Sequence, residues 1–201
     1  MITDKPPRKI ADKEEYARSD AMKSLLLPAE VRLQQCAKEI ELLLKCEDRK
    51  KIETASNELG AIVAACYGVK CPTVKVLGVR PLEENGDRVD ELFGDYDFDS
   101  QRIRLWMRTA VLEKATSYGT FLSTLCHELC HHLDVVHFGF PHTFHTCGFY
   151  ERAGLLYHHA RSTPARQLVW EKQSNGTHRI NWPMTMRGPA KPISSDLLAS
   201  K

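Results

Sequence analysis

Residues 127–131 of this chain read His-Glu-Leu-Cys-His, and six of the nine histidines lie between residues 127 and 145. On a helix, His127 and His131 are one turn apart on the same face, so their imidazoles can bind one Zn²⁺ together. Glu128 would lie beside the zinc-bound water, where it can take a proton and later pass it to a leaving amine. The spacing therefore predicts a zinc-dependent hydrolytic site, with His127 and His131 as ligands and Glu128 as the general base.

A catalytic zinc site needs a third ligand from another part of the chain and an open position for water. Two candidates follow the motif, His142 and His145, which come 11 and 14 residues after His131. Pro141 favours a turn ahead of both. His145 would stand near the start of the next helix, where Phe149 can pack on its ring. This support favours His145 as the ligand and His142 as a loop histidine at the cleft or the surface.

Several other side chains near the motif could assist the chemistry. Asp134 lies one turn past the motif on nearly the same helical face, so it could hold an imidazole tautomer or be an exposed acid. Tyr150, Arg152 and Tyr157 follow further along the chain. Each of these three could stabilise the oxyanion that forms during hydrolysis, with packing or surface roles as the alternative.

The hydrophobic pattern predicts the elements that would position these residues. Around the motif it predicts a helix from about Ser117 to His137 and another from about Phe144 to His159. Upstream of the motif, the pattern predicts helices over 28–46 and 48–66 and strands over 73–80 and 101–108. It also predicts a turn at Asn85-Gly86 within an acidic stretch, and a late hairpin formed by Asn175-Gly176 and its flanks. Short strands beside long helices predict an α+β fold.

The composition of the chain restricts its class. Its 201 residues include 28 Lys and Arg and 26 Asp and Glu, a net charge of +2, which excludes a uniformly basic nucleic-acid binder. No apolar run is long enough to span a membrane and the N-terminus has no secretory signal, so no membrane partner is expected. The seven cysteines include no CxxC pair and are expected to be free thiols. We therefore expect a cytoplasmic protein, and the sequence makes no prediction of oligomeric state.

The motif and its surroundings resemble the SprT-like family of zinc metallopeptidases. The likeness covers about residues 72–160 and depends on His137-Phe138-Gly139, on the spacing of His145 and Phe149, and on a hairpin between Gly94 and Leu105. It implies a zincin-like core, in which a small antiparallel or mixed sheet supports the HExxH helix. It also implies that Zn²⁺ is the cofactor and that the chain hydrolyses peptide bonds in protein or peptide substrates.

The expected organisation has four parts. A charged, frayed leader covers residues 1–27, a SprT-like zincin domain with its N-terminal helices covers 28–164, a C-terminal hairpin covers 165–186 and a flexible tail covers 187–201. Two alternative functions stay open beside the peptidase: a DNA-associated protease or regulator, and a non-hydrolytic binding module stabilised by zinc. Many SprT-like proteins carry a cysteine-rich zinc ribbon that has no counterpart here, so only weak DNA association is expected.

Overall fold

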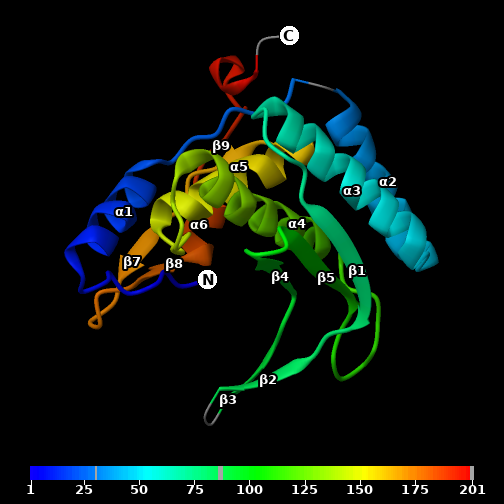
Figure 1. The fold of residues 1–201 in the computed structure, drawn as a ribbon, viewed down its shortest axis with the longest axis horizontal. Coiled ribbons are helices and arrows are strands. Elements are labelled where there is room, and N and C mark those ends of the chain that lie inside the picture. The colour runs from blue at the N-terminus through cyan, green and yellow to red at the C-terminus, as the bar shows by residue number, and fades with distance from the viewer. Residues whose placement is uncertain (30, 86–87, 200–201) are drawn as a thin grey trace.

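The computed structural model describes residues 1–29, 31–85 and 88–199, which combine helices and small sheets in an α+β fold (Figure 1). The α-helices of these residues are α1 (Ile10–Ala21), α2 (Val31–Cys46), α3 (Arg49–Cys66), α4 (Tyr118–Leu133), α5 (Cys147–Ala160) and α6 (Trp182–Arg187). A π-helical turn, η1 (Asp134–Phe138), follows α4, and a short 3-10 helix, η2 (Ser195–Leu197), lies near the C-terminus. None of the helices described here is both long and apolar enough to cross a membrane.

The central sheet has the strand order β1-β5-β4, with β5 parallel to β1 and antiparallel to β4. Antiparallel pairs also form between β2 and β3, β6 and β9, and β7 and β8. The strands are β1 (Thr73–Val79), β2 (Leu82–Asn85), β3 (Arg88–Glu91), β4 (Gly94–Asp97), β5 (Arg102–Arg108), β6 (Ala165–Arg166), β7 (Trp170–Lys172), β8 (His178–Ile180) and β9 (Ala190–Lys191). The central sheet is thus mixed, and the β4–β5 pair is the hairpin expected between Gly94 and Leu105.

Helices α3 and α4 pack against the central sheet, and α2 packs against α3 (Figure 1). The alternation of the strands explains this layering. Val74 and Val76 of β1 and Ile103 and Leu105 of β5 are buried, and the residues between them are exposed. Successive side chains of a strand point to opposite faces, so these strands present one apolar face to the helices. Helix α4 therefore lies between this sheet and α5, with which it also packs.

Most elements lie where the hydrophobic pattern predicts them. The helix expected over about 117–137 is α4 together with η1, whereas the helix expected from Phe144 begins later, at Cys147. The two upstream helices and the two expected strands also form. Strands β7 and β8 form the hairpin expected around Asn175-Gly176. Of the turn expected at Asn85-Gly86, Gly86 lies outside the described residues.

The prediction of a frayed leader over residues 1–27 is wrong for much of that segment. Helix α1 forms within it and packs against α5, and Leu25 and Leu27 are buried. Arg152 of α5 donates a hydrogen bond to the backbone carbonyl of Ser19 at 2.9 Å. These contacts come from distant parts of the chain, so the local charge pattern could not reveal them.

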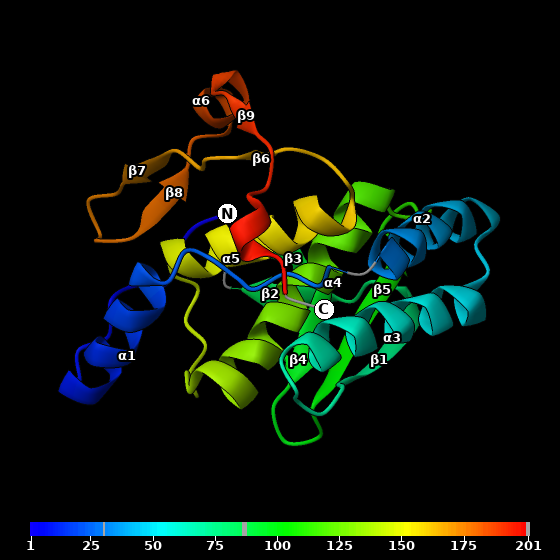
Figure 2. The same ribbon diagram turned by 90° about the horizontal axis from the view of Figure 1, so that it is seen from above.

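The prediction of a flexible tail over residues 187–201 is also corrected for its described part. Strand β9 pairs with β6, and the backbone amide of Leu27 donates to the carbonyl of Leu197 at 2.6 Å. These backbone hydrogen bonds hold a segment whose low apolar content suggested disorder. In Figure 2 the C-terminal elements β7, β8 and α6 lie on the opposite side of α5 from α3 and β1.

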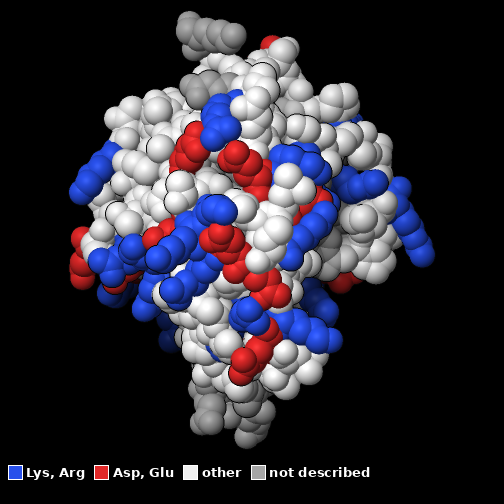
Figure 3. All heavy atoms as spheres, turned by 90° about the vertical axis from the view of Figure 1, so that its right-hand side faces the viewer, with Lys and Arg blue, Asp and Glu red and all other residues white. Residues whose placement is uncertain are grey.

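The face at the right of Figure 1 carries α2, α3 and β1, and its charges are mixed. Figure 3 shows lysine and arginine side chains interspersed with acidic ones on this face. Lys75 of β1 pairs with Glu53 of α3 at 3.1 Å, and Arg108 of β5 pairs with Glu47. The basic residues of β1 and β5 are therefore partly neutralised rather than gathered into one cationic surface.

Candidate metal centre

Helix α4 carries the first two histidines of the candidate centre. Ser117 caps its N-terminus by accepting a hydrogen bond from the backbone amide of Thr120 at 3.1 Å. On the sheet side, Gly94 of β4 comes so close that a Cβ there would lie 2.6 Å from Cγ2 of Thr124. Glycine thus allows β4 to lie against α4, beside the HExxH motif.

The segment between α4 and α5 returns a third histidine to the motif. The π-helical turn ends at Gly139, whose φ of 68° lies in the left-handed region that favours glycine. After Pro141 the chain reaches His145 just before α5, and the side chain of Thr146 caps α5 by accepting from the amide of Phe149 at 3.0 Å. This cap fixes the backbone directly after His145.

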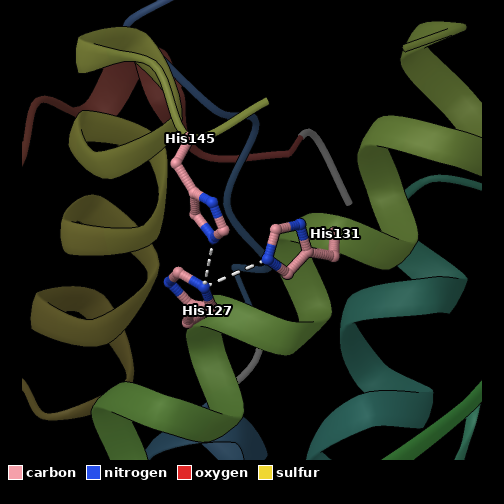
Figure 4. Close-up of side chains that lie close together, drawn as sticks. All are labelled: His127, His131 and His145. Carbon is pink, nitrogen blue, oxygen red and sulfur yellow. Dashed lines mark hydrogen bonds between the residues drawn. The ribbon is translucent and has the colours of Figure 1, made fainter. Parts of the chain in front are cut away.

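The imidazoles of His127, His131 and His145 point toward one another (Figure 4). Nε2 of His127 lies 3.0 Å from Nε2 of His145 and 3.0 Å from Nε2 of His131. A tetrahedral zinc ion with bonds of about 2.0–2.1 Å would hold its nitrogen ligands about 3.3–3.4 Å apart, close to these separations. The structure thus brings His145 together with the two motif histidines, and the three residues could hold one metal ion.

A cation fits this arrangement better than hydrogen bonds between the rings do. An imidazole nitrogen carries either one hydrogen or one lone pair, so Nε2 of His127 cannot make full hydrogen bonds to both neighbours. Burial is the main cause that lowers the pKa of His127 to about 3, and the neighbouring His145 is the second cause. Burial is also the main cause that lowers the pKa of His131. Both rings are therefore neutral near pH 7, the form that binds metal ions.

Aromatic packing supports the three rings. The ring centroid of Phe149, which is fully buried, lies 4.8 Å from that of His127, 4.5 Å from that of His131 and 5.2 Å from that of His145. The predicted packing of Phe149 on His145 is confirmed, and it extends to all three histidines. One rigid side chain thus restricts the motion of the whole group.

A chain of hydrogen bonds holds the ring of His131. Its Nδ1 lies 2.7 Å from Oγ1 of Thr143, and that hydroxyl donates to the Asp134 carboxylate at 3.1 Å. The hydroxyl has one hydrogen, so it accepts from Nδ1–H of His131, which leaves Nε2 with its lone pair. Asp134 is fully buried and pairs with Arg152 at 2.8 Å. Asp134 therefore supports the His131 tautomer through Thr143, a residue that the sequence pattern did not single out.

The N-terminal segment supports His145. The Asp4 carboxylate accepts a hydrogen bond from the backbone amide of His145 at 2.9 Å, and its Oδ2 lies 3.5 Å from Nδ1 of the ring. Burial alone would raise the pKa of Asp4, but hydrogen bonding to His145 holds this pKa below its usual value. Carboxylates commonly orient metal-binding histidines in this way. Sequence reasoning missed Asp4 because 141 positions separate it from His145 and no local pattern joins them.

Glu128 lines a cleft of about 320 Å³ together with the three histidines and residues 94–96 of β4. Its side chain is largely buried, with the residue 5% exposed. Burial is the main cause that raises the pKa of Glu128 to about 8, and the negative charge of Asp95 is the second cause. A carboxylate whose pKa lies near neutral pH is well suited to accept a proton and release it again.

Two other histidines near the motif have different partners. Nδ1 of His142 lies 2.7 Å from the Glu15 carboxylate of α1, which also accepts from the His142 backbone amide at 2.8 Å. His142 therefore lies at the rim of the cleft, as expected for a loop histidine. The ring nitrogens of His132 lie 2.8 Å from the carbonyl of Lys70 and 2.9 Å from the hydroxyl of Tyr96, so His132 joins the motif helix to its surroundings.

The three residues considered for oxyanion stabilisation lie at different places. Arg152 is fully buried behind the histidines, so it cannot contact a substrate, and that hypothesis is wrong. The ring of Tyr150 stacks on that of His145 with centroids 5.7 Å apart. Tyr157 lies two helical turns further along α5. Among the three, Tyr150 is the residue beside the candidate centre.

Comparison of the chain with protein-family models, with curated protein sequences and with solved structures finds no match. The class of the site is therefore defined by its own geometry. It consists of three converging imidazoles, a buried carboxylate on the same helix and a cleft beside them.

Proposed function

We propose that this chain is a zinc-dependent metallopeptidase of the SprT-like zincin type that hydrolyses peptide bonds in protein substrates. The observation that carries the proposal is the convergence of three Nε2 atoms beside the buried Glu128 carboxylate in one cleft. His127, His131 and His145 would hold the ion. Three imidazole ligands suit zinc and leave a fourth position open.

The residues of the cleft support hydrolysis of a peptide. A bound zinc ion supplies a Lewis acid that polarises a carbonyl group and lowers the pKa of water. Glu128 accepts a proton from the attacking water and donates it to the leaving amine. Strand β4 is an edge of the central sheet and lines the cleft, so an extended peptide can pair with its backbone.

The test is the Glu128→Gln variant, with Glu14→Gln on the exposed face of α1 as the matched control. We expect Glu128→Gln to keep its zinc, measured by elemental analysis, and to lose at least about 10²-fold in the rate of cleavage of a fluorogenic protein substrate. The control should retain both zinc and rate. Unchanged cleavage by Glu128→Gln would contradict the proposed mechanism.

A zinc-loaded wild-type chain that cleaves no protein or peptide would instead support the non-hydrolytic binding module. Stimulation of cleavage by DNA would support the DNA-associated alternative. The mixed charges and ion pairs on the face of α2, α3 and β1 do not favour that alternative. Cleavage assays with and without DNA therefore distinguish the three functions.

A further inference from the structure

A second cavity, of about 450 Å³, shares His127 with the Glu128 cleft as a lining residue. We call it the α6 pocket, because α4, α5 and α6 with the neighbouring hairpin form its walls. His127 lines both cavities, and Tyr150, which stacks on His145, lines the α6 pocket as well. A substrate bound in the cleft would therefore have this pocket directly beside its reacting bond.

The wall contributed by α6 is apolar and uncovered. Trp182 is 44% exposed and Met186 is 60% exposed, although both belong to a helix that is held in place. Thr185, between them, is buried and accepts a hydrogen bond from the amide of Val169 at 3.0 Å. Large apolar side chains that are exposed together in the lining of one pocket are typical of a binding surface. This wall therefore favours a large apolar side chain as its ligand.

The pocket also has a cationic end. Arg161 lies near the start of α4, because a Cβ on Gly119 would lie 4.0 Å from its guanidinium group. Gly119 is eight residues before His127 on α4, so these two residues are about 12 Å apart along the helix axis. Arg161 donates to the hydroxyl of Tyr157, and Arg166 donates to backbone carbonyls. Among the described residues, Arg161 has no carboxylate within ion-pair distance, and Glu41 is the acidic side chain near enough to feel its charge. An extended substrate peptide covers about 12 Å in three or four residues.

We propose that the α6 pocket is the specificity pocket of the peptidase. It takes a large apolar side chain of the substrate next to the scissile bond, and Arg161 takes an acidic side chain about three residues further along. This inference rests on the proposed function, and it names the substrate class: apolar-acidic segments of proteins. The apolar walls and the positive charge of Arg161 supply the complementary chemistry.

Gly154 of α5 offers a way to fill the pocket without disturbing the fold. It lines the pocket, and a Cβ built there meets no atom within 4 Å. Gly154→Leu therefore places a side chain in open space, and Gly154→Ala is its matched control, since alanine adds one methyl group. Both residues favour a helix more than glycine does, so neither variant should lose stability.

The experiment measures cleavage sites in a peptide library digested by the zinc-loaded chain, with mass spectrometry as the readout. We expect wild type and Gly154→Ala to prefer Leu, Phe or Met over Ala at one position flanking the cleaved bond. Gly154→Leu should reduce that preference at least about 10-fold. Arg161→Gln should keep the apolar preference and lose the preference for Asp or Glu. Unchanged apolar preference in Gly154→Leu overturns the proposal.

A binding measurement separates failure of this inference from failure of the proposed function. The peptide acetyl-Leu-Ala-Ala-Asp-amide is titrated calorimetrically into zinc-loaded Glu128→Gln, with and without Gly154→Leu. Binding that is weakened at least about 10-fold by Gly154→Leu supports the pocket even if the wild-type chain cleaves nothing. Equal binding to both variants, or no binding to Glu128→Gln, overturns it. Absence of cleavage by itself contradicts only the peptidase function.

Discussion

At the scale of single residues, the three histidines differ in what supports each ring. His131 is held through Thr143 and Asp134, and His145 is held by Asp4. His127 is restrained mainly by ring contacts. Such supporting contacts decide how well a ligand is positioned, because an imidazole that can rotate binds a metal ion less tightly.

The third ligand is tested by comparing His145→Ala with His142→Ala. The Nε2 of His145 lies 3.0 Å from that of His127, whereas Nδ1 of His142 contacts Glu15 instead. We expect His145→Ala to lose most of its bound zinc and His142→Ala to keep it, measured as metal per purified chain. The opposite pattern would show that His142 is the ligand.

Asp4 should strengthen metal binding without touching the ion. Asp4→Asn keeps the size of the side chain but removes the charge that faces Nδ1 of His145. We expect zinc affinity to fall by about 10–100-fold, measured by competition with a chelator of known affinity. The exposed Asp99→Asn is the control and should bind zinc like wild type. Equal affinity of the two variants would show that Asp4 is only a structural contact.

At the level of secondary-structure elements, Gly148 at the start of α5 determines how closely α1 packs against α5. A Cβ on Gly148 would lie 2.1 Å from the backbone carbonyl oxygen of Ser19 and 2.7 Å from that of Met22. Arg152 donates to the same two carbonyls, so α1 ends directly against α5. Glycine at this position is therefore required by the packing of two helices.

Two glycines of α5 make a matched pair for testing this packing. We expect Gly148→Ala to lower the free energy of unfolding by about 1–3 kcal/mol, because backbone must move to admit the methyl group. Gly154→Ala should raise it by about 0.5–1 kcal/mol, because its Cβ meets open space and alanine favours the helix. Urea unfolding followed by circular dichroism measures both. A stabilising Gly148→Ala would contradict the close contact of α1 with α5.

At the scale of the whole molecule, charge sets the expectation for nucleic acid. The net charge is +2, and acidic residues are interspersed with basic ones on the face shown in Figure 3. We expect weak DNA binding that falls steeply with salt, measured by fluorescence anisotropy across a salt series. Nanomolar binding that persists at about 200 mM salt would contradict this and favour the DNA-associated alternative.

The local features of the fold could be predicted from the order of the amino acids. Apolar residues at helical spacing predict α4, and alternation predicts β1 and β5, because the period of a side-chain pattern follows from backbone geometry. The spacing of His127 and His131 places both rings on one helix face for the same reason. The turn ahead of His145 and the packing of Phe149 were also predictable from nearby residues.

The contacts between distant segments could not be predicted in this way and are seen only in the folded chain. Asp4 reaches His145, Glu15 binds His142 and α1 packs on α5, although residues 1–27 look like a polar leader. The α6 pocket likewise forms only when α6 is brought beside α4 and α5. Such contacts join polar groups far apart in the chain, and they leave no periodic signal because each depends on the packing of complete elements.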